Sequence, residues 1–398
     1  MRTVVTGASG FVGQQLVPIL LEKGHELLLV GRNKVELSRL WPNLQVCSYE
    51  ELAERGRGFD QLLHLAVLNN DANASDQEYF LVNVDFALRT ARSAREAGIG
   101  HFINVSSFHA IGDALHPYAR SKRAAVEALQ AEQGITCTSI YLPAVYGDRW
   151  SGKLAVLNRL PGPLARALFT CLSAIKPTVH VRAIADACDI SSCSGVRFVA
   201  DDQDRNVVYS VVRRMIDVSF AMVVVLMFWW ALLLIWCAVR LQSPGPGIFA
   251  QTRVGKRGQH FTCYKFRTMY VGTLQAGTHQ VSTTAVTPLG NFMRRTKIDE
   301  LPQVWNILQN ELSLVGPRPC LPVQVELVAA REARNVFAVS PGITGLAQVN
   351  DVDMSEPVRL AEWDARYVAT RSLLLDLAIL VRTALGRGQG DRISSRKP

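Results

Sequence analysis

The sequence predicts an α/β protein with a doubly wound parallel sheet, a membrane-embedded helix and a smaller, helix-rich domain. Three observations lead to this prediction. The 398-residue chain begins with a short β run and a glycine-rich turn, and an uncharged run of 22 residues occupies positions 218–239. The formal charge of +9 belongs entirely to the second half, because residues 1–205 hold 21 basic and 21 acidic side chains. We therefore expect domains at 1–205 and 241–398, joined by a membrane-associated helix at 206–240.

The first strand, at residues 3–5, leads into a glycine-rich turn with the sequence T-G-A-S-G-F-V-G. A helix-like stretch follows it at residues 14–22. Glycines in this position allow a tight turn and a close approach of the backbone, so that a pyrophosphate binds at the helix N-terminus. The pattern predicts a dinucleotide-binding site. Its residues are Gly7, Gly10, Phe11, Val12 and Gly13.

The second strand, at residues 26–30, ends in Gly31-Arg32-Asn33 without the acidic residue that usually binds the ribose hydroxyls of NAD. Arg32 would pair with a 2′-phosphate, so we expect NADP(H) rather than NAD(H). A solvated turn arginine is the alternative interpretation of Arg32.

Six further segments continue the pattern of the first domain. They are L-L-H-L-A at 62–66, Asn83, V-S-S at 105–107, P-Y-A-R-S-K at 117–122, L-P-A-V-Y-G at 142–147 and H-V-R-A-I-A-D-A at 180–187. Together they resemble the extended short-chain dehydrogenase/reductases of the nucleotide-sugar epimerase, dehydratase and reductase group.

That resemblance implies a catalytic set of Ser107, Tyr118 and Lys122. Tyr118 and Lys122 are four residues apart and share one helix face, where an ammonium group would lower the pKa of the phenol. Tyr118 would then exchange a proton while the nicotinamide exchanges a hydride. The region after residue 180 is compressed relative to the family, which reduces the sugar-binding part. The first domain is therefore either a reductase with an open site or a non-catalytic sugar-nucleotide-binding module.

The uncharged run at 218–239 would span about 33 Å as a helix. Arginines lie on both sides of it, at positions 213, 214 and 240, so both flanks are expected on the cytoplasmic side. We expect a re-entrant helix, anchored by Trp229 and Trp230, rather than a spanning one. A second apolar stretch, 372–385, is expected either as an interfacial helix or as a buried core helix.

Five ordered motifs occupy the second half of the chain. They are R-R-M-I-D at 213–217, F-A-Q-T-R-V-G at 249–255, Y-K-F-R-T-M at 264–269, K-I-D-E-L-P through L-S-L-V-G-P-R-P at 297–319, and P-G-I-T-G-L-A-Q-V-N at 341–350. They resemble the bacterial sugar transferases, which are monotopic phosphoglycosyl transferases. Members of that family commonly break the membrane helix with a Ser-Pro pair, where this chain has Trp229-Trp230.

The resemblance to the sugar transferases implies transfer of a phospho-sugar from a UDP-sugar to undecaprenyl phosphate, with release of UMP. Asp299 would be the nucleophile, Glu300 its neighbour, and both would hold Mg²⁺ at the diphosphate. The positive side chains expected around the phosphates are Lys265, Arg267, Arg294 and Arg318.

We therefore expect a bifunctional enzyme at the cytoplasmic face of a bacterial inner membrane, where it starts the synthesis of a surface glycan. The first domain would complete the UDP-sugar by reduction of a 4-keto sugar nucleotide. Basic charge beside an apolar run suits anionic lipids, and no nucleic-acid motif accompanies it. Both families lead us to expect a homodimer. The eight cysteines lack paired spacing, which favours reduced thiols.

Overall fold

The computed structural model describes residues 1–70, 72, 74–111, 116–150, 152–189, 195–273 and 285–388. The chain forms two compact units. The first comprises Met1–Ser173 and Pro177–Asp202, and the second comprises Ala174–Lys176 and Gln203–Pro398.

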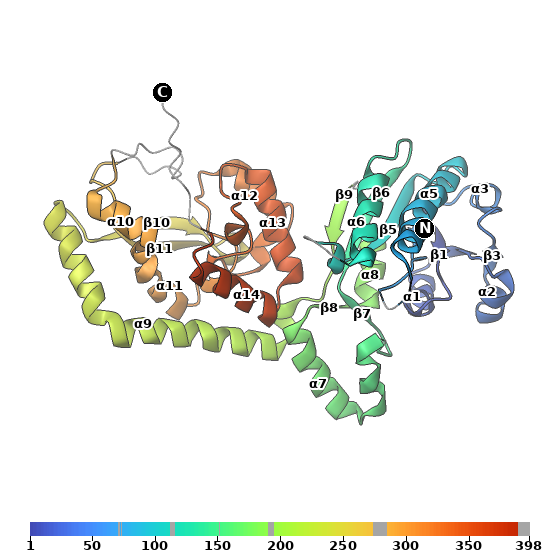
Figure 1. Cartoon of the computed structure of the whole chain (residues 1–398), viewed down its shortest axis with the longest axis horizontal. Coiled ribbons are helices and arrows are strands. Elements are labelled where there is room, and N and C mark those ends of the chain that lie inside the picture. The colour runs from blue at the N-terminus through green and yellow to red at the C-terminus, as the bar shows by residue number, and fades with distance from the viewer. Residues whose placement is uncertain are drawn as a thin grey trace. The chain divides into compact units, whose positions relative to one another are not determined.

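The first unit is built on a parallel sheet of seven strands in the order β3-β2-β1-β4-β5-β6-β9 (Figure 1). The strands are β1 (Arg2–Thr6), β2 (Glu26–Val30), β3 (Gln45–Cys47), β4 (Gln61–His64), β5 (His101–Ser107), β6 (Thr136–Leu142) and β9 (Gly195–Phe198). Strand order reverses at β1, which lies between β2 and β4. Ligands of such sheets bind at this reversal, beyond the carboxyl ends of the strands.

Helices cover both faces of the sheet, which confirms the doubly wound prediction. Neighbouring strand residues alternate between two cores, as a pleated strand requires. Val4 belongs to the cluster that contains Ala91 of α5 (Phe86–Glu96), whereas Val5 belongs to the cluster that contains Leu16 of α1 (Phe11–Glu22). The helices of this unit are α1 (Phe11–Glu22), α2 (Lys34–Leu40), α3 (Leu52–Arg55), α4 (Asp76–Phe80), α5 (Phe86–Glu96), α6 (Pro117–Gln130), α7 (Gly162–Ile175) and α8 (Val181–Cys188).

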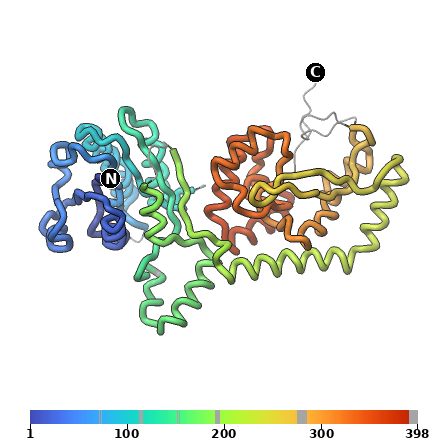
Figure 2. Tube along the Cα trace, turned by 180° about the vertical axis from the view of Figure 1, so that it is seen from behind, coloured from blue at the N-terminus to red at the C-terminus, as the bar shows by residue number. Residues whose placement is uncertain are grey.

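A small substructure follows β6 in the chain. It contains a short parallel pair, β7 (Ala144–Tyr146) with β8 (Thr178–His180), and the 3-10 segment η3 (Gly152–Arg159). Helix α7 follows η3 and projects away from the sheet in both views (Figures 1 and 2).

The second unit begins with α9 (Val207–Gln242), an unbroken helix of 36 residues. It is long and apolar enough to cross a membrane, with a mean hydropathy of 2.6 over its most apolar window, of which 11% is buried. The helix changes direction partway along its length, and the rest of the unit lies inside the bend (Figures 1 and 2). Its early residues Ala221 and Val224 pack in one core cluster and Val239 packs in another. The helix thus lies along two separate cores of the same unit.

The remainder of the second unit consists of two small sheets and short helices. Its elements are the antiparallel pair β10 (Ile248–Val254) and β11 (His260–Phe266), α10 (Pro288–Thr296), η8 (Ile298–Gln303), α11 (Val304–Leu308), the parallel pair β12 (Ser313–Val315) and β13 (Gly342–Thr344), α12 (Val325–Glu332), α13 (Pro357–Thr370) and α14 (Leu373–Ala384). Helix α14 buries Ile379 in the core while Leu377 and Val381 remain exposed. The inner face of α14 therefore belongs to the core. Contact of its exposed outer face with a membrane stays a prediction.

Candidate active site

The adjacent acids Asp299 and Glu300 lie in the first turn of η8 and are both buried, with 8% of each exposed. Lys297 precedes them in the left-handed region, with φ of 59°, and ends α10 while it begins η8. Its Nζ donates to the carbonyl oxygen of Gly388 at 2.6 Å. The sharp change of direction at Lys297 therefore turns the acids inward, away from the surface where first-turn acids usually lie.

The two carboxyl groups have opposite electrostatic surroundings. Burial and the charge of Glu300 raise the pKa of Asp299 to about 6. Burial alone would raise the pKa of Glu300 as well, but Lys265 and Arg318 outweigh it and hold this pKa well below its ordinary value. Glu300 Oε1 accepts from Lys265 Nζ at 2.7 Å and from Arg318 Nη2 at 3.0 Å. At neutral pH the pair is ionised, with Glu300 already paired to two cations and Asp299 held at a higher proton affinity.

The turn that carries Arg318 is fixed from two sides. A Cβ on Gly342 would meet the amide nitrogen of Gly316 at 2.1 Å, so the motifs around 316 and 342 pack backbone against backbone. From the other side, Arg331 Nη1 donates to the carbonyl oxygen of Arg318 at 2.8 Å. The same guanidinium forms a buried ion pair with Asp364, at 2.7 Å from Nη2 to Oδ2. Arg318 is thus positioned by Arg331 and by the backbone around Gly342, neither of which lies in the Pro-Arg-Pro motif.

A pocket opens beside Glu300. Its lining comprises Arg253, Cys263, Lys265, Glu300, Gln303, Arg318, Pro319, Gly342 and Ile343. Three of these side chains are cationic, so the pocket suits an anionic group such as a diphosphate. Arg253 Nη1 donates to the carbonyl oxygen of Pro319 at 2.9 Å, which ties strand β10 to the Pro-Arg-Pro turn.

The four predicted cations do not form one group. Lys265 and Arg318 contact Glu300, and Arg294 lies close enough to lower the pKa of Asp299 while its Nε donates to Thr268 Oγ1 at 3.0 Å. Arg267 lies elsewhere. Its guanidinium donates to the carbonyl oxygens of Ser243 at 2.7 Å and Pro244 at 3.0 Å, beyond the last turn of α9. A cation there complements the helix dipole, so Arg267 caps the C-terminus of α9.

The R-R-M-I-D motif joins the start of α9 to the catalytic unit. Arg213 Nε donates to Ser313 Oγ at 3.1 Å, and Arg214 Nη1 donates to the carbonyl oxygen of Ile307 at 2.7 Å. Asp217 Oδ1 accepts from the amide of Leu314 at 2.8 Å. These contacts reach β12 and the C-terminal end of α11, which follow the acidic pair in the chain.

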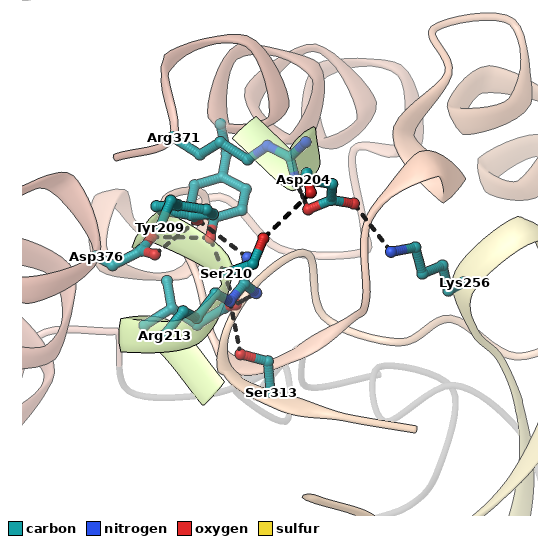
Figure 3. Close-up of polar contacts among 10 residues, drawn as sticks. Asp204, Tyr209, Ser210, Arg213, Lys256, Ser313, Arg371 and Asp376 are labelled. Carbon is teal, nitrogen blue, oxygen red and sulfur yellow. Dashed lines mark hydrogen bonds and ion pairs between the residues drawn. The ribbon is translucent and has the colours of Figure 1, made fainter. Parts of the chain in front are cut away.

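Further polar contacts surround the first turn of α9 (Figure 3). Tyr209 Oη donates to Asp376 Oδ2 at 2.9 Å, and Asp204 pairs with Arg371 at 2.8 Å and Lys256 at 2.9 Å. The chain that enters α9 is thus held by β10–β11 and by the α13–α14 connection.

The glycine turn of the first unit leaves no room for side chains. Gly7 has φ of +72°, and a Cβ there would meet the amide nitrogen of Ala66 at 2.7 Å. A Cβ on Gly13 would meet the carbonyl oxygen of Gly7 at 2.5 Å. Phe11 and Val12 form the first turn of α1, whose N-cap is Gly10. The residues fit a pyrophosphate, since the backbone approaches closely and the N-terminus of α1 follows directly after the glycine turn. Arg32 is exposed just beyond the carboxyl end of β2.

Ser107, Tyr118 and Lys122 lie on β5 and α6, which contact each other. Ser107 Oγ is hydrogen-bonded to His109 Nδ1 at 3.0 Å, and Lys122 Nζ donates to the carbonyl oxygen of Val105 at 2.8 Å. Burial lowers the pKa of Lys122 to about 7. The ring of Tyr118 lies edge-on to that of His109, 6.3 Å between centroids. The three predicted residues therefore share one region, with the serine and the lysine each engaged by a neighbouring group.

Sequence reasoning missed four residues of this architecture: Arg331, Asp364, Asn306 and Gln303. Asn306 Nδ2 donates to the carbonyl oxygen of Thr262 and to Glu311, at 2.7 Å each, and joins α11 to β11. Asn306 lies within a quoted motif, but an amide that bonds backbone carries no signal of its own. Among the described residues, no group of three or more His, Cys, Asp or Glu gathers as a metal centre.

Residues 208–387 match the family described as Bacterial sugar transferase, and residues 3–192 match the NAD dependent epimerase/dehydratase family. The chain is 42% identical over 145 residues to the sugar transferase EpsL of Bacillus subtilis, covering 36% of this chain and 71% of EpsL. It is 38% identical over 185 residues to the UDP-glucose:undecaprenyl-phosphate glucose-1-phosphate transferase of Caulobacter vibrioides, covering 43% of this chain and 67% of that enzyme. The chain belongs to the bacterial sugar transferase family, and it carries an epimerase/dehydratase-like domain before the transferase.

A protein from Xanthomonas campestris pv. campestris with the same name as the Caulobacter enzyme is 35% identical over 193 residues. That match covers 46% of this chain and 40% of the Xanthomonas enzyme, so the chain spans less than half of that relative's length. Among solved structures, the Bordetella bronchiseptica enzyme WbmG in complex with NAD is similar with a TM-score of 0.40 and 20% identity, over 50% of this chain and 72% of WbmG.

Proposed function

We propose that the second unit transfers a phospho-sugar from a UDP-sugar to undecaprenyl phosphate and releases UMP. The observation that carries the proposal is the buried Asp299–Glu300 pair, in which Glu300 is paired with Lys265 and Arg318 beside a cationic pocket. The names of the Caulobacter and Xanthomonas relatives support the acceptor and the nucleotide sugar.

Transfer proceeds by two displacements at one phosphorus atom. The Asp299 carboxylate attacks the β-phosphorus of the UDP-sugar, the bond to the bridging oxygen breaks, and UMP leaves with the bonding electrons. A phosphate oxygen of undecaprenyl phosphate then attacks the same phosphorus and releases Asp299 as a carboxylate. Arg318 and Lys265 neutralise the charge of the phosphates, and Glu300 keeps these two cations in place between turnovers.

The acidic pair also fits a divalent cation. Mg²⁺ is commonly held by one or two carboxylates together with substrate phosphates rather than by a cage of protein ligands. Asp299 and Glu300 would hold it, and it would neutralise charge on the diphosphate.

The placement of α9 supports a helix that enters and leaves one membrane face. Its first turns are attached to β12 and α11, while Arg267, just after β11, donates to the carbonyl oxygens of Val239 in its last turn and Ser243 just beyond it. Both ends therefore contact the same folded unit, and a spanning helix would separate these ends by the thickness of the bilayer. The exposed Trp229 and Trp230 suit the interface of the cytoplasmic leaflet. Cysteine labelling at both flanks in intact cells tests this, and labelling of the two ends from opposite faces of the membrane would refute it.

For the first unit we propose NADPH-dependent reduction of a 4-keto nucleotide sugar. Tyr118 would donate a proton to the carbonyl oxygen, which Ser107 would hydrogen-bond, and the bound nicotinamide would supply the hydride. Lys122, with its pKa lowered to about 7, contributes a positive charge beside the phenol whenever it is protonated. Arg32 supports the choice of NADP(H).

The alternative for the first unit is a non-catalytic nucleotide-sugar-binding module. It is favoured by the engagement of Ser107 with His109 and of Lys122 with the backbone of Val105, and by the small substructure that replaces the sugar-binding half.

The test uses the full chain in nanodiscs with undecaprenyl phosphate, Mg²⁺, NADPH and a panel of UDP-sugars, including 4-keto-6-deoxy sugars. UMP release and NADPH oxidation are followed together, with Asp299→Ala and Tyr118→Phe as controls. Coupled NADPH oxidation and UMP release, lost separately in the two variants, supports two consecutive reactions. UMP release with NADPH untouched across the panel leaves the transferase and makes the first unit a binding module. An Asp299→Ala variant that still releases UMP at the wild-type rate overturns the transferase mechanism.

A further inference from the structure

Helix α7, whose residues up to Ser173 belong to the first unit, presents an apolar stripe to solvent. Leu164, Leu168 and Leu172 recur at four-residue intervals and are 49%, 41% and 42% exposed. Cys171 lies next to the stripe and is also exposed. Residues at this spacing share one helix face. Ala165, beside the stripe, is 1% exposed, and the exposed Arg166 lies on the face opposite the stripe. α7 is thus amphipathic, and its apolar stripe is exposed to solvent.

The segment around α7 carries a one-sided charge. Residues 149–185 include six basic side chains and no acidic one, whereas the first 205 residues as a whole are neutral. The basic residues are Arg149, Lys153, Arg159, Arg166, Lys176 and Arg182. The positive charge of the first half is therefore concentrated on the segment that contains the apolar stripe.

We propose that α7 lies in the interface of an anionic membrane, with its leucine stripe among the acyl chains and the flanking cations at the lipid phosphates. An exposed apolar stripe with basic residues around it is the pattern of an interfacial helix. Each cation near an anionic surface strengthens attachment about fivefold. A second copy of this chain is a poorer occupant, because it would bring two basic segments together. The inference rests on the proposed membrane location of the chain and adds a second, independent contact made by the nucleotide-binding unit.

The consequence concerns the substrate. A first unit attached to the lipid surface through α7 does not tumble freely on the chain before α9. The nucleotide sugar that it releases enters the layer next to the membrane, where the transferase draws its substrate.

A fluorophore on Cys171 tests the contact in the full chain. Cys193 and Cys237 are first replaced by serine, so that Cys171 is the labelled thiol. The chain is then placed in nanodiscs at one copy per disc, with anionic or purely zwitterionic lipids. We expect blue-shifted emission, quenching by lipids doxyl-labelled near the headgroup and protection from aqueous iodide, all in anionic discs. Arg159→Gln and Lys176→Gln should each reduce the membrane-bound population ratio about fivefold.

Two matched variants separate the stripe from a general effect of charge. Leu168→Glu together with Leu172→Glu should abolish the blue shift. Leu40→Glu on α2 should leave it unchanged, since Leu40 has the same exposure of 40%. A fluorophore on Val35→Cys, at a position 81% exposed on α2, should stay accessible to iodide.

The outcomes discriminate the proposals. Full iodide access at Cys171 in anionic discs overturns the membrane contact, while UMP release in the same discs shows that the transferase proposal stands. Shielding of Cys171 that appears only with two copies per disc, and that lipid quenchers do not reach, also overturns it and assigns the stripe to a second copy.

Discussion

Replacement of Glu300 by glutamine should separate substrate binding from turnover. Glu300 Oε1 is shared by Lys265 Nζ at 2.7 Å and Arg318 Nη2 at 3.0 Å, so the three groups carry a net charge of +1. The substitution raises this charge to +2 with almost no change of shape. One additional unit charge about 5 Å from a phosphate contributes about 0.8 kcal/mol even at the dielectric constant of water. UDP should therefore bind about fourfold more tightly in the absence of divalent ions.

Turnover should change in the opposite direction. Without the carboxylate, the two cations are no longer held in the geometry that the proposed transition state needs, and one of the two carboxylates proposed to hold Mg²⁺ is lost. A loss of about 10²- to 10³-fold in kcat is typical when one preorganised electrostatic group is removed. The charge of Glu300 also raises the pKa of Asp299, so the acid limb of the pH profile should move to lower pH.

The assay combines isothermal titration with UDP in metal-free buffer and UMP release in nanodiscs with Mg²⁺. The matched control is Glu326→Gln, which makes the same charge change at an exposed site on α12. Unchanged UDP affinity and wild-type kcat in Glu300→Gln would refute the assignment of Glu300 as the group that holds the two cations. An equal gain of UDP affinity in Glu326→Gln would show that net charge, not the pocket, is responsible.

Three more outcomes follow from the geometry. UMP release should fall as pH drops through about 6, tenfold per unit below it, because Asp299, the proposed nucleophile, would attack only when ionised and its pKa is raised to about 6; a limb near pH 4 would contradict this. Gly13→Ala should weaken NADPH binding by at least tenfold and spare UMP release, since its Cβ would meet the carbonyl oxygen of Gly7 at 2.5 Å, whereas Gly100→Ala, with open space around it, should bind normally. Lys122 has its pKa lowered from 10.5 to about 7, so the unfolded state binds more protons between these values and stability should rise with pH across that window, by up to about 5 kcal/mol. The first unit is followed by its melting transition, which NADPH shifts in the wild type. In Lys122→Met the temperature of this transition should be higher than in the wild type at pH 7 and should not change between pH 7 and 9.5. A lower melting temperature at pH 7 would contradict the assignment.

The sequence predicted the architecture where a local pattern determines it. The short apolar runs of β1 and β4 and the glycines at 7, 10 and 13 sufficed for the doubly wound sheet and its turn, because strand burial and backbone clearance are local properties. The adjacent acids were equally visible. Their different proton affinities were not, because these depend on Lys265, 35 residues before Glu300, and on Arg318, 18 residues after it.

Long-range roles of arginine were the main gap in the sequence analysis. Lys265 and Arg267 are two residues apart in one motif, and charge alone placed both at the phosphates. Only the fold reveals that Lys265 contacts Glu300 while Arg267 binds the carbonyl oxygens that end α9. Arg331 carried no motif signal, yet its contact with the backbone of Arg318 and its ion pair with Asp364 fix the Pro-Arg-Pro turn.

Helix α9 lacks the Ser-Pro pair that members of the family commonly carry. Contacts at both ends of the helix hold it against the rest of the second unit instead. A proline bends a helix locally, because it removes one hydrogen bond and clashes with the preceding turn. Here α9 keeps all its turns, and its direction is set by attachment of Arg213 and Asp217 at the start and by Arg267 at the end. A spanning arrangement would strip partners from a buried arginine at one end, a loss of about 3 to 5 kcal/mol for each buried charge left unpaired. The contacts at both ends therefore support the proposed re-entrant helix, which would keep the acidic pair, the cations and the membrane surface on one side.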